Sequence, residues 1–297
     1  MDMRRFIPAF GGHIPGPWIA GTWTRDPATG LWTNPGIVPG ANVIVDGPFD
    51  TDIGAGNWSG ANWVIGATGV ATHTPGAGTE LSNVGGAAAV VGKWYRLTVD
   101  FVSMTVSGGY MRYGGSLSPY YTTIGSKTAV VRATTTIQAQ ITPNLNTWDG
   151  VVDNYTAKPL ALSELIAYRN YGRQVSIASA LTMTAGIPGG VVSRLSVNED
   201  GTFNFVHCWH DGTRLHLDTV VNSTTVVSKV NATAAYGATK APKINFPSAN
   251  VAQALYGPLG SEVQIGTDQD ISAVPAGTYA GLFSTDSTVT LGDPVIT

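Results

Sequence analysis

The chain has 297 residues and a formal net charge of −3, and charged side chains make up 12% of it, about half of the usual share of roughly 25%. A charge density this low argues against coiled coils, long helical bundles and charged disordered tails, and the lack of any Lys/Arg run argues against a dedicated nucleic-acid binder. The 37 glycines and 17 prolines favour short strands and many turns and leave almost no room for long helices.

The single cysteine, Cys208, excludes an internal disulfide, so stability has to come from burial or assembly. The basic start Met1–Phe6 is followed by prolines and glycines rather than by the apolar run of a signal peptide. The most apolar stretch, Ala87–Val91, is too short to span a bilayer. We therefore expect neither signal-directed secretion nor membrane insertion.

Residues 1–41 are rich in Pro, Gly and Trp and are interrupted too often to build a core of their own. Three tryptophans in such a segment, Trp18, Trp23 and Trp32, predict that this arm docks onto another surface. Two alternatives stay open. The arm anchors the chain to another protein or a neighbouring subunit, or it packs on the domain that follows it.

Residues 42–159 consist of short alternating runs between turn residues. In Trp94–Phe101 the odd-numbered residues are apolar, which predicts one face in the core and one face outside, as in an antiparallel sandwich. The other predicted strands of this region are Asn42–Val45, Asn62–Ile65, Gly69–Thr74, Lys127–Ala133, Thr135–Ile141 and Val151–Thr156.

A tyrosine-rich segment, Gly108–Tyr121, is predicted to be a loop excursion, because its composition is typical of recognition surfaces. Sugar rings stack their C–H faces on aromatic planes while their hydroxyls form directional hydrogen bonds. The alternative for each aromatic ring is a place in the core or in a subunit interface. The candidate sugar-binding residues of this region are Tyr110, Tyr113, Tyr120 and Tyr121.

Residues 160–297 begin with one predicted helical turn, Ser163–Ala167, after which strands resume. The clearest feature is a hairpin in which Phe203–His210 and Thr213–Val221 are separated by Asp211-Gly212, the strongest short hairpin signal. A two-residue turn predicts that the last residue of the first run faces the first residue of the second.

The hairpin carries one polar and aromatic face, which we expect to meet water, a ligand or another chain. Such a face combines the ring and the hydrogen-bonding groups that a sugar site requires. Its candidate sugar-binding residues are His207, Trp209, Arg214, His216 and Asp218.

Five stretches carry a family resemblance in the first of these regions: Val43–Asp50, Trp63–Gly66, Gly69–Thr74, Val91–Val99 and Trp148–Asn154. In order and spacing, residues 42–159 resemble the carbohydrate-binding-module type of galactose-binding-like jelly roll that recurs in bacteriophage virion proteins. The resemblance implies a structural calcium ion with Asp50 and Asp153 as its acidic ligands, and oxygen ligands suit this hard cation. Pro48 departs from the family's opening motif and removes a backbone donor there.

Two further stretches, His210–Asn222 and Ala280–Thr285, give residues 160–297 a resemblance to the laminin-G/concanavalin A-like lectin sandwich. The two modules often follow one another in phage structural proteins, so their pairing implies a virion component. Pro242 and Pro247 stand where related chains run a continuous strand, which predicts a shortened or edge-located sheet.

Catalytic templates are missing from the sequence. It contains neither His-Glu-x-x-His nor Gly-x-Ser-x-Gly, and its four glutamates do not form the Glu-x-Asp-x-x-Glu pattern of lectin-fold glycosidases. We therefore expect no enzymatic activity.

The sequence is interpreted as all-β, with two antiparallel β-sandwich (jelly-roll) domains, residues 42–159 and 160–297, preceded by an irregular N-terminal arm, residues 1–41. We expect an accessory protein of the phage virion, on head or tail, that binds host surface polysaccharide weakly and through many copies, and that requires no cofactor apart from the calcium that the resemblance implies. Its expected partners are other virion proteins and further copies of itself. A trimer is a guess from the threefold symmetry of phage fibres. Two alternatives stay open: a purely structural cement protein and a polysaccharide depolymerase.

Overall fold

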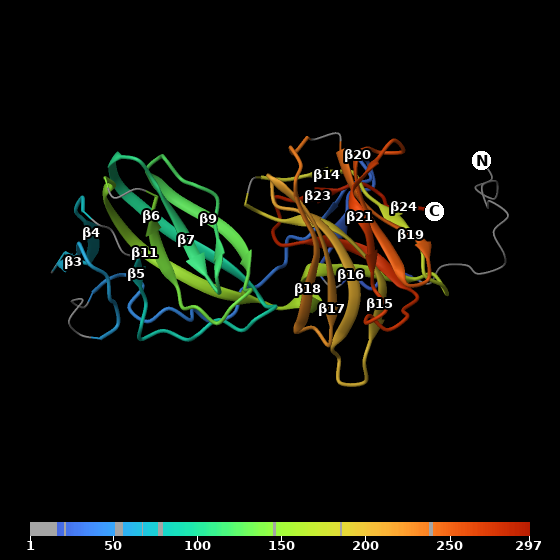
Figure 1. Cartoon of the computed structure of the whole chain (residues 1–297), viewed down its shortest axis with the longest axis horizontal. Helices are drawn as coiled ribbons and strands as arrows, with labels where there is room; N and C mark the ends of the chain where they lie inside the picture. The colour runs from blue at the N-terminus through green and yellow to red at the C-terminus, as the bar shows by residue number, and fades with distance from the viewer. Residues whose placement is uncertain are drawn as a thin grey trace.

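The computed structural model describes residues 17–297 except positions 21, 51–55, 67, 77–79, 145–146, 185 and 238–239. This part of the chain is almost entirely antiparallel β-sheet, which confirms the predicted all-β class. It contains no helix long and apolar enough to cross a membrane. Figure 1 shows two sheet-rich lobes, the first drawn mainly in green and teal and the second mainly in yellow to red.

The first lobe is a sandwich of two sheets around one hydrophobic core. The five-stranded sheet consists, in spatial order, of β3 (Trp63–Gly66), β4 (Val70–His73), β11 (Asp149–Leu160), β6 (Trp94–Val106) and β9 (Gly125–Arg132). The four-stranded sheet consists of β5 (Leu81–Ser82), β10 (Gln140–Pro143), β7 (Gly109–Tyr113) and β8 (Ser116–Leu117).

The alternation along β6 is confirmed, because the odd-numbered residues from Tyr95 to Phe101 are buried in this core. Three other predictions for this lobe are wrong. The predicted strand Thr135–Ile141 is a strand only from Gln140 on, where β10 begins. The segment 42–45 lies outside the strands, since the Asn42 side chain accepts hydrogen bonds from the backbone N–H groups of Ile44 and Ala157 and so replaces a strand ladder. The tyrosine-rich segment is not a loop excursion but contains β7 and β8, which pair as a hairpin.

The second lobe is a sandwich of a six-stranded and a five-stranded sheet. The six-stranded sheet consists of β12 (Ile166–Asn170), β22 (Tyr279–Ser284), β15 (Gly189–Val197), β16 (Phe203–His210), β17 (Arg214–Val221) and β18 (Thr225–Thr233). The five-stranded sheet consists of β21 (Val263–Asp270), β20 (Val251–Pro258), β19 (Lys240–Ser248), β13 (Ile177–Ala178) and β24 (Val295–Ile296).

Two local expectations for this lobe can be compared with the structure. The predicted helical turn is present as α1 (Leu162–Leu165), shifted toward the N-terminus. The strand around Pro242 and Pro247 is neither short nor at the edge, because β19 lies between β20 and β13. Both prolines lie beyond the two residues of β19 that pair with β13, so their missing N–H groups interrupt no part of that ladder.

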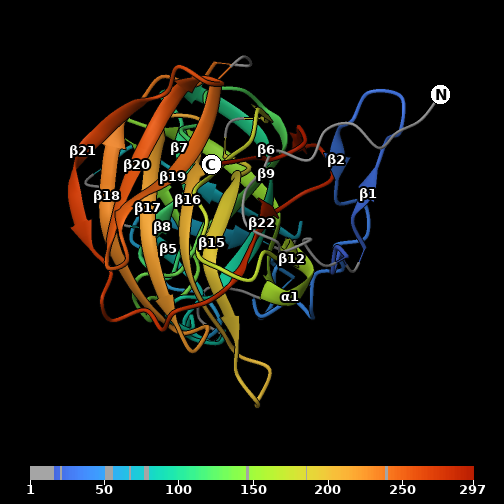
Figure 2. The ribbon, with the colours of Figure 1, turned by 90° about the vertical axis from the view of Figure 1, so that its right-hand side faces the viewer.

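The described part of the N-terminal arm, which starts at residue 17, packs on the second sandwich. Its strands β1 (Thr24–Arg25) and β2 (Trp32–Thr33) join β23 (Thr290–Leu291) and β14 (Leu181–Thr182) in a small sheet, beside the second lobe in Figure 2. Trp23 and Trp32 are buried in the core of that lobe, and Trp18 packs on Trp32 with ring centroids 4.9 Å apart.

The predicted role as an anchor on another protein is therefore corrected for Trp23 and Trp32, and it stays a prediction for Trp18. Trp23 and Trp32 are covered by their own chain, and Trp18 is partly covered by it. The arm takes the second alternative, packing on the chain itself, but on the second sandwich rather than on the first.

The two sandwiches share hydrophobic packing. Trp94, Val130 and Leu160, which belong to strands of the first sandwich, are part of the core cluster of the second. β11 ends at Leu160, so this strand crosses the predicted limit between residues 159 and 160. The domain limits at 41/42 and 159/160 stay predictions.

Candidate functional site

The hairpin of β16 and β17 is present, but its register differs from the predicted one by two residues. His210 pairs with Leu215 instead of Thr213, and Trp209 pairs with His216 instead of Arg214. The cause is the side chain of Asp211, whose Oδ1 accepts the backbone N–H groups of Thr213 and Arg214 at 2.7 Å and so widens the turn. Because strand faces repeat every two residues, the shift leaves the same side chains on each face.

The polar and aromatic face of this hairpin is buried, which contradicts the prediction of a surface that meets water or a sugar. Arg214 is the exception, because its side chain is exposed and donates to Asn231 Oδ1. The covering surface is provided by Trp94 and Arg132 of the first sandwich. We call this contact between the two sandwiches the seam. The buried members of the face are Phe205, His207, Trp209, His216 and Asp218.

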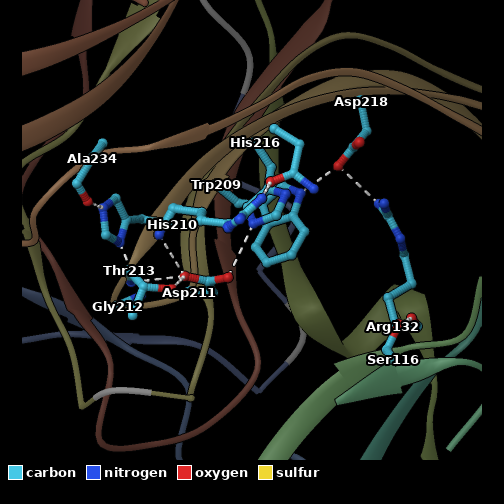
Figure 3. A network of polar contacts seen from close by, with 12 residues as sticks. Ser116, Arg132, Trp209, His210, Asp211, Gly212, Thr213, His216, Asp218 and Ala234 are labelled. Carbon is cyan, nitrogen blue, oxygen red and sulfur yellow. Dashed lines mark hydrogen bonds and ion pairs between the residues drawn. The ribbon is translucent and has the colours of Figure 1, made fainter. Parts of the chain in front are cut away.

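An ion pair lies in the middle of the seam (Figure 3). Arg132 Nη1 donates to Asp218 Oδ2 at 2.9 Å, and the two side chains are 9% and 0% exposed. The indole N–H of Trp209 donates to the same carboxylate oxygen. The Arg132 guanidinium also lies 5.6 Å and 5.5 Å from the ring centroids of Trp94 and Trp209. Both donors therefore bind Oδ2, while Asp218 Oδ1 is buried and has no hydrogen-bond partner in the described part of the chain.

The network continues from Trp209 to the turn of the hairpin. The Trp209 and His216 rings stack with centroids 3.8 Å apart, and His216 Nε2 lies 3.1 Å from Asp211 Oδ2. Burial raises the pKa of the Asp211 carboxyl, but hydrogen bonds from His216 and from two backbone N–H groups outweigh burial and hold this pKa well below its ordinary value. The turn thus carries a carboxylate that stays ionised.

His207 lies in the apolar part of the seam. Its ring is 4.1 Å from Phe283 and 6.2 Å from Trp94, centroid to centroid. Burial, followed by the nearby charges of Arg132 and His216, lowers the pKa of His207 well below its ordinary value. This imidazole is therefore neutral at pH 7 and packs as an aromatic ring.

Two more polar contacts join the two sandwiches. Arg96 of β6 forms an ion pair of 2.8 Å with Asp286, which follows β22. The backbone N–H of Val130 donates to the carbonyl of Gly186 at 2.9 Å. Since side chains and backbone of both sandwiches are joined in this way, the seam is an interface within the chain and not a ligand site.

An aromatic pair with one exposed ring, Tyr120, and one half-buried ring, Tyr110, remains on the first sandwich. The rings of Tyr110 and Tyr120 lie 5.1 Å apart, and Tyr120 is 39% exposed. The Tyr110 hydroxyl donates to Asn144 Oδ1 at 3.3 Å, and the Tyr120 hydroxyl lies 3.1 Å from Ser107 Oγ. The two rings are therefore fixed next to each other by polar contacts at their outer ends.

Polar side chains flank this pair on the outer side of the four-stranded sheet. Thr142 pairs with Tyr110, and Gln140 pairs with Arg112, across β10 and β7. Thr142 Oγ1 and Gln140 Oε1 are buried and have no hydrogen-bond partner within the described part of the chain. Both atoms are enclosed by neighbouring protein atoms, so a ligand reaches them only when a neighbouring side chain moves aside. We call Tyr110, Tyr120, Thr142, Gln140 and Asn144 the tyrosine face.

The other two candidate tyrosines are not on this face. Tyr113 is buried in the first core, where its hydroxyl donates to the carbonyl of Ala87, and burial raises its pKa. Tyr121 is partly buried against Phe101, its hydroxyl donates to the Thr128 carbonyl, and burial raises its pKa to about 12. The prediction of a sugar-binding role for Tyr113 is wrong because its ring is a core residue.

The acidic residues proposed for calcium lie near the same end of β4. A Cβ placed on Gly69, one residue before β4, would be 3.3 Å from Asp50 Oδ1. Asp153 follows Val152, which pairs with Ala71 of β4. In the described residues no group of three or more His, Cys, Asp or Glu side chains converges on one point. Calcium is bound by carbonyl and carboxylate oxygens, so the calcium site stays a prediction.

Sequence reasoning missed the seam residues of the first sandwich, although the sequence contains a signal for them. Trp94, Arg96 and Arg132 belong to predicted strands, and Trp94 and Arg96 occupy the outward-facing positions of β6. A tryptophan on an outward-facing position predicts a covered surface. Thr142, Gln140 and Asn144 had no comparable signal, because their neighbourhood depends on the pairing of β10 with β7.

Comparisons with known proteins identify no family for the chain. No protein-family model matches it, and no curated protein matches it. Among solved structures, the carbohydrate-binding module CBM66 from Bacillus subtilis is similar, with a TM-score of 0.33 and 10% sequence identity over 44% of this chain and 81% of that chain.

Proposed function

We propose that this protein is a non-enzymatic accessory component of a bacteriophage particle and that its tyrosine face binds host surface glycans. The virion assignment rests on the resemblance of the two modules to those of phage structural proteins. The sugar-binding assignment rests on one observation. Two tyrosine rings lie 5.1 Å apart on an outward sheet face that also carries polar atoms without partners.

The chemistry of the tyrosine face suits a saccharide. An aromatic ring provides a plane for the C–H face of a pyranose. The exposed Asn144 amide group can donate to sugar hydroxyls, and Thr142 Oγ1 and Gln140 Oε1 can accept from them once a neighbouring side chain moves aside. The face is open rather than enclosed, so binding of one copy is expected to be weak, and useful adhesion requires many copies on one particle.

The test is a saccharide titration of the full chain followed by NMR or on a glycan array. We expect binding in the millimolar range, lost in Tyr120→Ala and reduced in Tyr110→Phe, which keeps the ring but removes the contact with Asn144. Val64→Ala is the matched control, because Val64 is exposed on the other sheet of the same sandwich. Equal binding by Tyr120→Ala and the parent would remove the tyrosine face as the site.

The two alternatives give different results. A cement protein would bind no sugar at millimolar concentration, and its loss would weaken the particle rather than adsorption. A depolymerase would release oligosaccharide from host capsule or lipopolysaccharide. Sedimentation of the free protein tests the proposed trimer.

A further inference from the structure

A cleft of about 460 Å³ lies where the arm, the two sandwiches and the segment between them meet. Its walls come from the loop before β6, from the end of β11 with α1, and from the turns before β16 and β18. Gly92 and Thr224 form the contact between two of these walls. A Cβ on Gly92, whose φ is +86°, would lie 2.6 Å from the Thr224 carbonyl oxygen, so glycine is needed for this approach.

The buried residues that line the cleft are apolar, and its exposed residues include polar side chains. Trp94, Leu160, Leu162 and Phe203 provide aromatic and aliphatic surface. Ser163 and Thr224 are exposed residues of the lining and carry hydroxyl groups. Clefts of this volume between domains, with apolar walls and a few polar groups, are the usual places for small organic ligands.

The cleft carries a positive charge, which comes from Lys93. Lys93 is exposed, and it is the one charged residue among the described residues that line the cleft. Its ammonium group forms no ion pair with a carboxylate in the described part of the chain. A ligand that fills the apolar interior and places an anionic group at the entrance would complement this surface.

We propose that the cleft binds a small amphipathic organic anion, with its rings or chain on Trp94, Leu162 and Phe203 and its sulfonate, carboxylate or phosphate group beside Lys93. This site is separate from the tyrosine face on β7 and β10, and it does not depend on the proposed function. It is created by the seam, because the fixed position of the two sandwiches holds its walls apart.

Two fluorescent probes that differ in one group test the proposal. 8-Anilinonaphthalene-1-sulfonate carries an anionic group on its aromatic rings, and N-phenyl-1-naphthylamine has the same rings without it. We expect the folded full chain to bind both saturably, at one site per chain, with energy transfer from tryptophan. Lys93→Met is expected to raise the Kd of the sulfonate probe about threefold to fivefold, which is the effect of losing one partly exposed charge pair. The Kd of the neutral probe should stay unchanged.

Ser163→Trp in α1 and Thr224→Trp in the turn before β18 each place a large ring on a different wall of the cleft, and each is expected to abolish binding of both probes. Lys127→Met is the matched control, because Lys127 lies on β9, outside the residues that line the cleft, and donates to Thr123 and Ile124. A thermal melt verifies the fold of each variant. Unchanged binding in both tryptophan variants would overturn the site. Equal weakening of both probes in Lys93→Met, or of neither, would overturn the anionic ligand class.

Discussion

Arg132 of the first sandwich and Asp218 of the second form an ion pair of 2.9 Å from which water is almost completely excluded. The two residues are 86 positions apart in the chain. A buried pair of this kind is costly to break from one side, because the remaining charge is left without a partner in a poorly solvated place. The docking of the two sandwiches on each other therefore depends on both Arg132 and Asp218.

Asp218→Asn is expected to lower the free energy of unfolding by about 3 kcal/mol at pH 7, since Arg132 would lose its buried counter-charge. Urea denaturation measures the change. Asp293→Asn is the control. Asp293 forms an exposed ion pair with Arg25 of the arm, so a much smaller loss of unfolding free energy is expected. Equal losses in the two variants would contradict the role given to the buried pair.

The stability of the protein should fall with acidification below pH 6.5 because of His207. Burial holds the pKa of this histidine well below its ordinary value of 6.5, so the unfolded chain takes up a proton that the folded chain does not. The free energy of unfolding then decreases as the pH falls, by up to about 1.4 kcal/mol per pH unit.

Urea denaturation between pH 7 and pH 4.5 tests this dependence, with His207→Phe as the comparison. The variant keeps an aromatic ring in the seam and cannot titrate, so its stability should depend less steeply on pH. Some dependence should remain, since burial also lowers the pKa of His210. The same slope in parent and variant would exclude His207 as a source of the acid sensitivity.

Thr142→Val separates stability from binding at the tyrosine face. The hydroxyl is buried and unpartnered in the described part of the chain, so its removal should leave stability unchanged or raise it by up to about 1 kcal/mol. The affinity for a saccharide should fall, because an acceptor and donor is lost. Urea denaturation and NMR titration measure the two effects, and a stable variant with full sugar affinity would speak against a role for Thr142.

Calcium is expected to raise the melting temperature if Asp50 and Asp153 bind it. At a concentration one hundred times the Kd, a ligand that binds only the folded state contributes about 2.7 kcal/mol. Thermal melts in calcium and in EDTA provide the measurement, and Asp153→Asn should abolish the difference. Identical melts of the parent protein in both buffers would remove the calcium prediction.

Trp32→Ala tests the assignment of the arm to the second sandwich. The ring is buried in the core of that sandwich and its N–H donates to Asp293 at 3.0 Å, so the variant should lose about 3–5 kcal/mol of stability. Urea denaturation distinguishes this from an external anchor. If Trp32 contacted a partner protein instead, stability would be unchanged and only assembly would suffer.

The sequence predicts the faces of the strands better than it predicts what covers them. The two-residue error at Asp211 did not change which side chains share a face, because the faces of a strand repeat every two residues. Whether Trp209 and His207 meet water was beyond local reasoning. Their cover is Trp94 and Arg132, which are distant in sequence, and their burial follows from the docking of two sandwiches.

The tyrosine face is a second case in which the sequence does not predict which side chains are covered. Composition singled out Tyr110 and Tyr120, which lie together on the surface, but also Tyr113, which is in the core. Tyr113 and Tyr110 differ by three positions along β7 and so point to opposite faces. Alternation of faces holds for a strand and not for a loop, so composition alone does not separate Tyr113 from Tyr110.

The pairing of Trp32 in β2 with Leu291 in β23 determines how mechanical load would travel through the molecule. A pull on the arm enters the second sandwich at the small sheet of β1, β2, β23 and β14. It reaches the first sandwich through the seam and through residues 34–41, which lead from β2 to β11, where the backbone N–H of Gly40 donates to the carbonyl of Pro159. Tension on the arm would therefore load the pairing of β2 with β23 before it displaced Tyr110 and Tyr120.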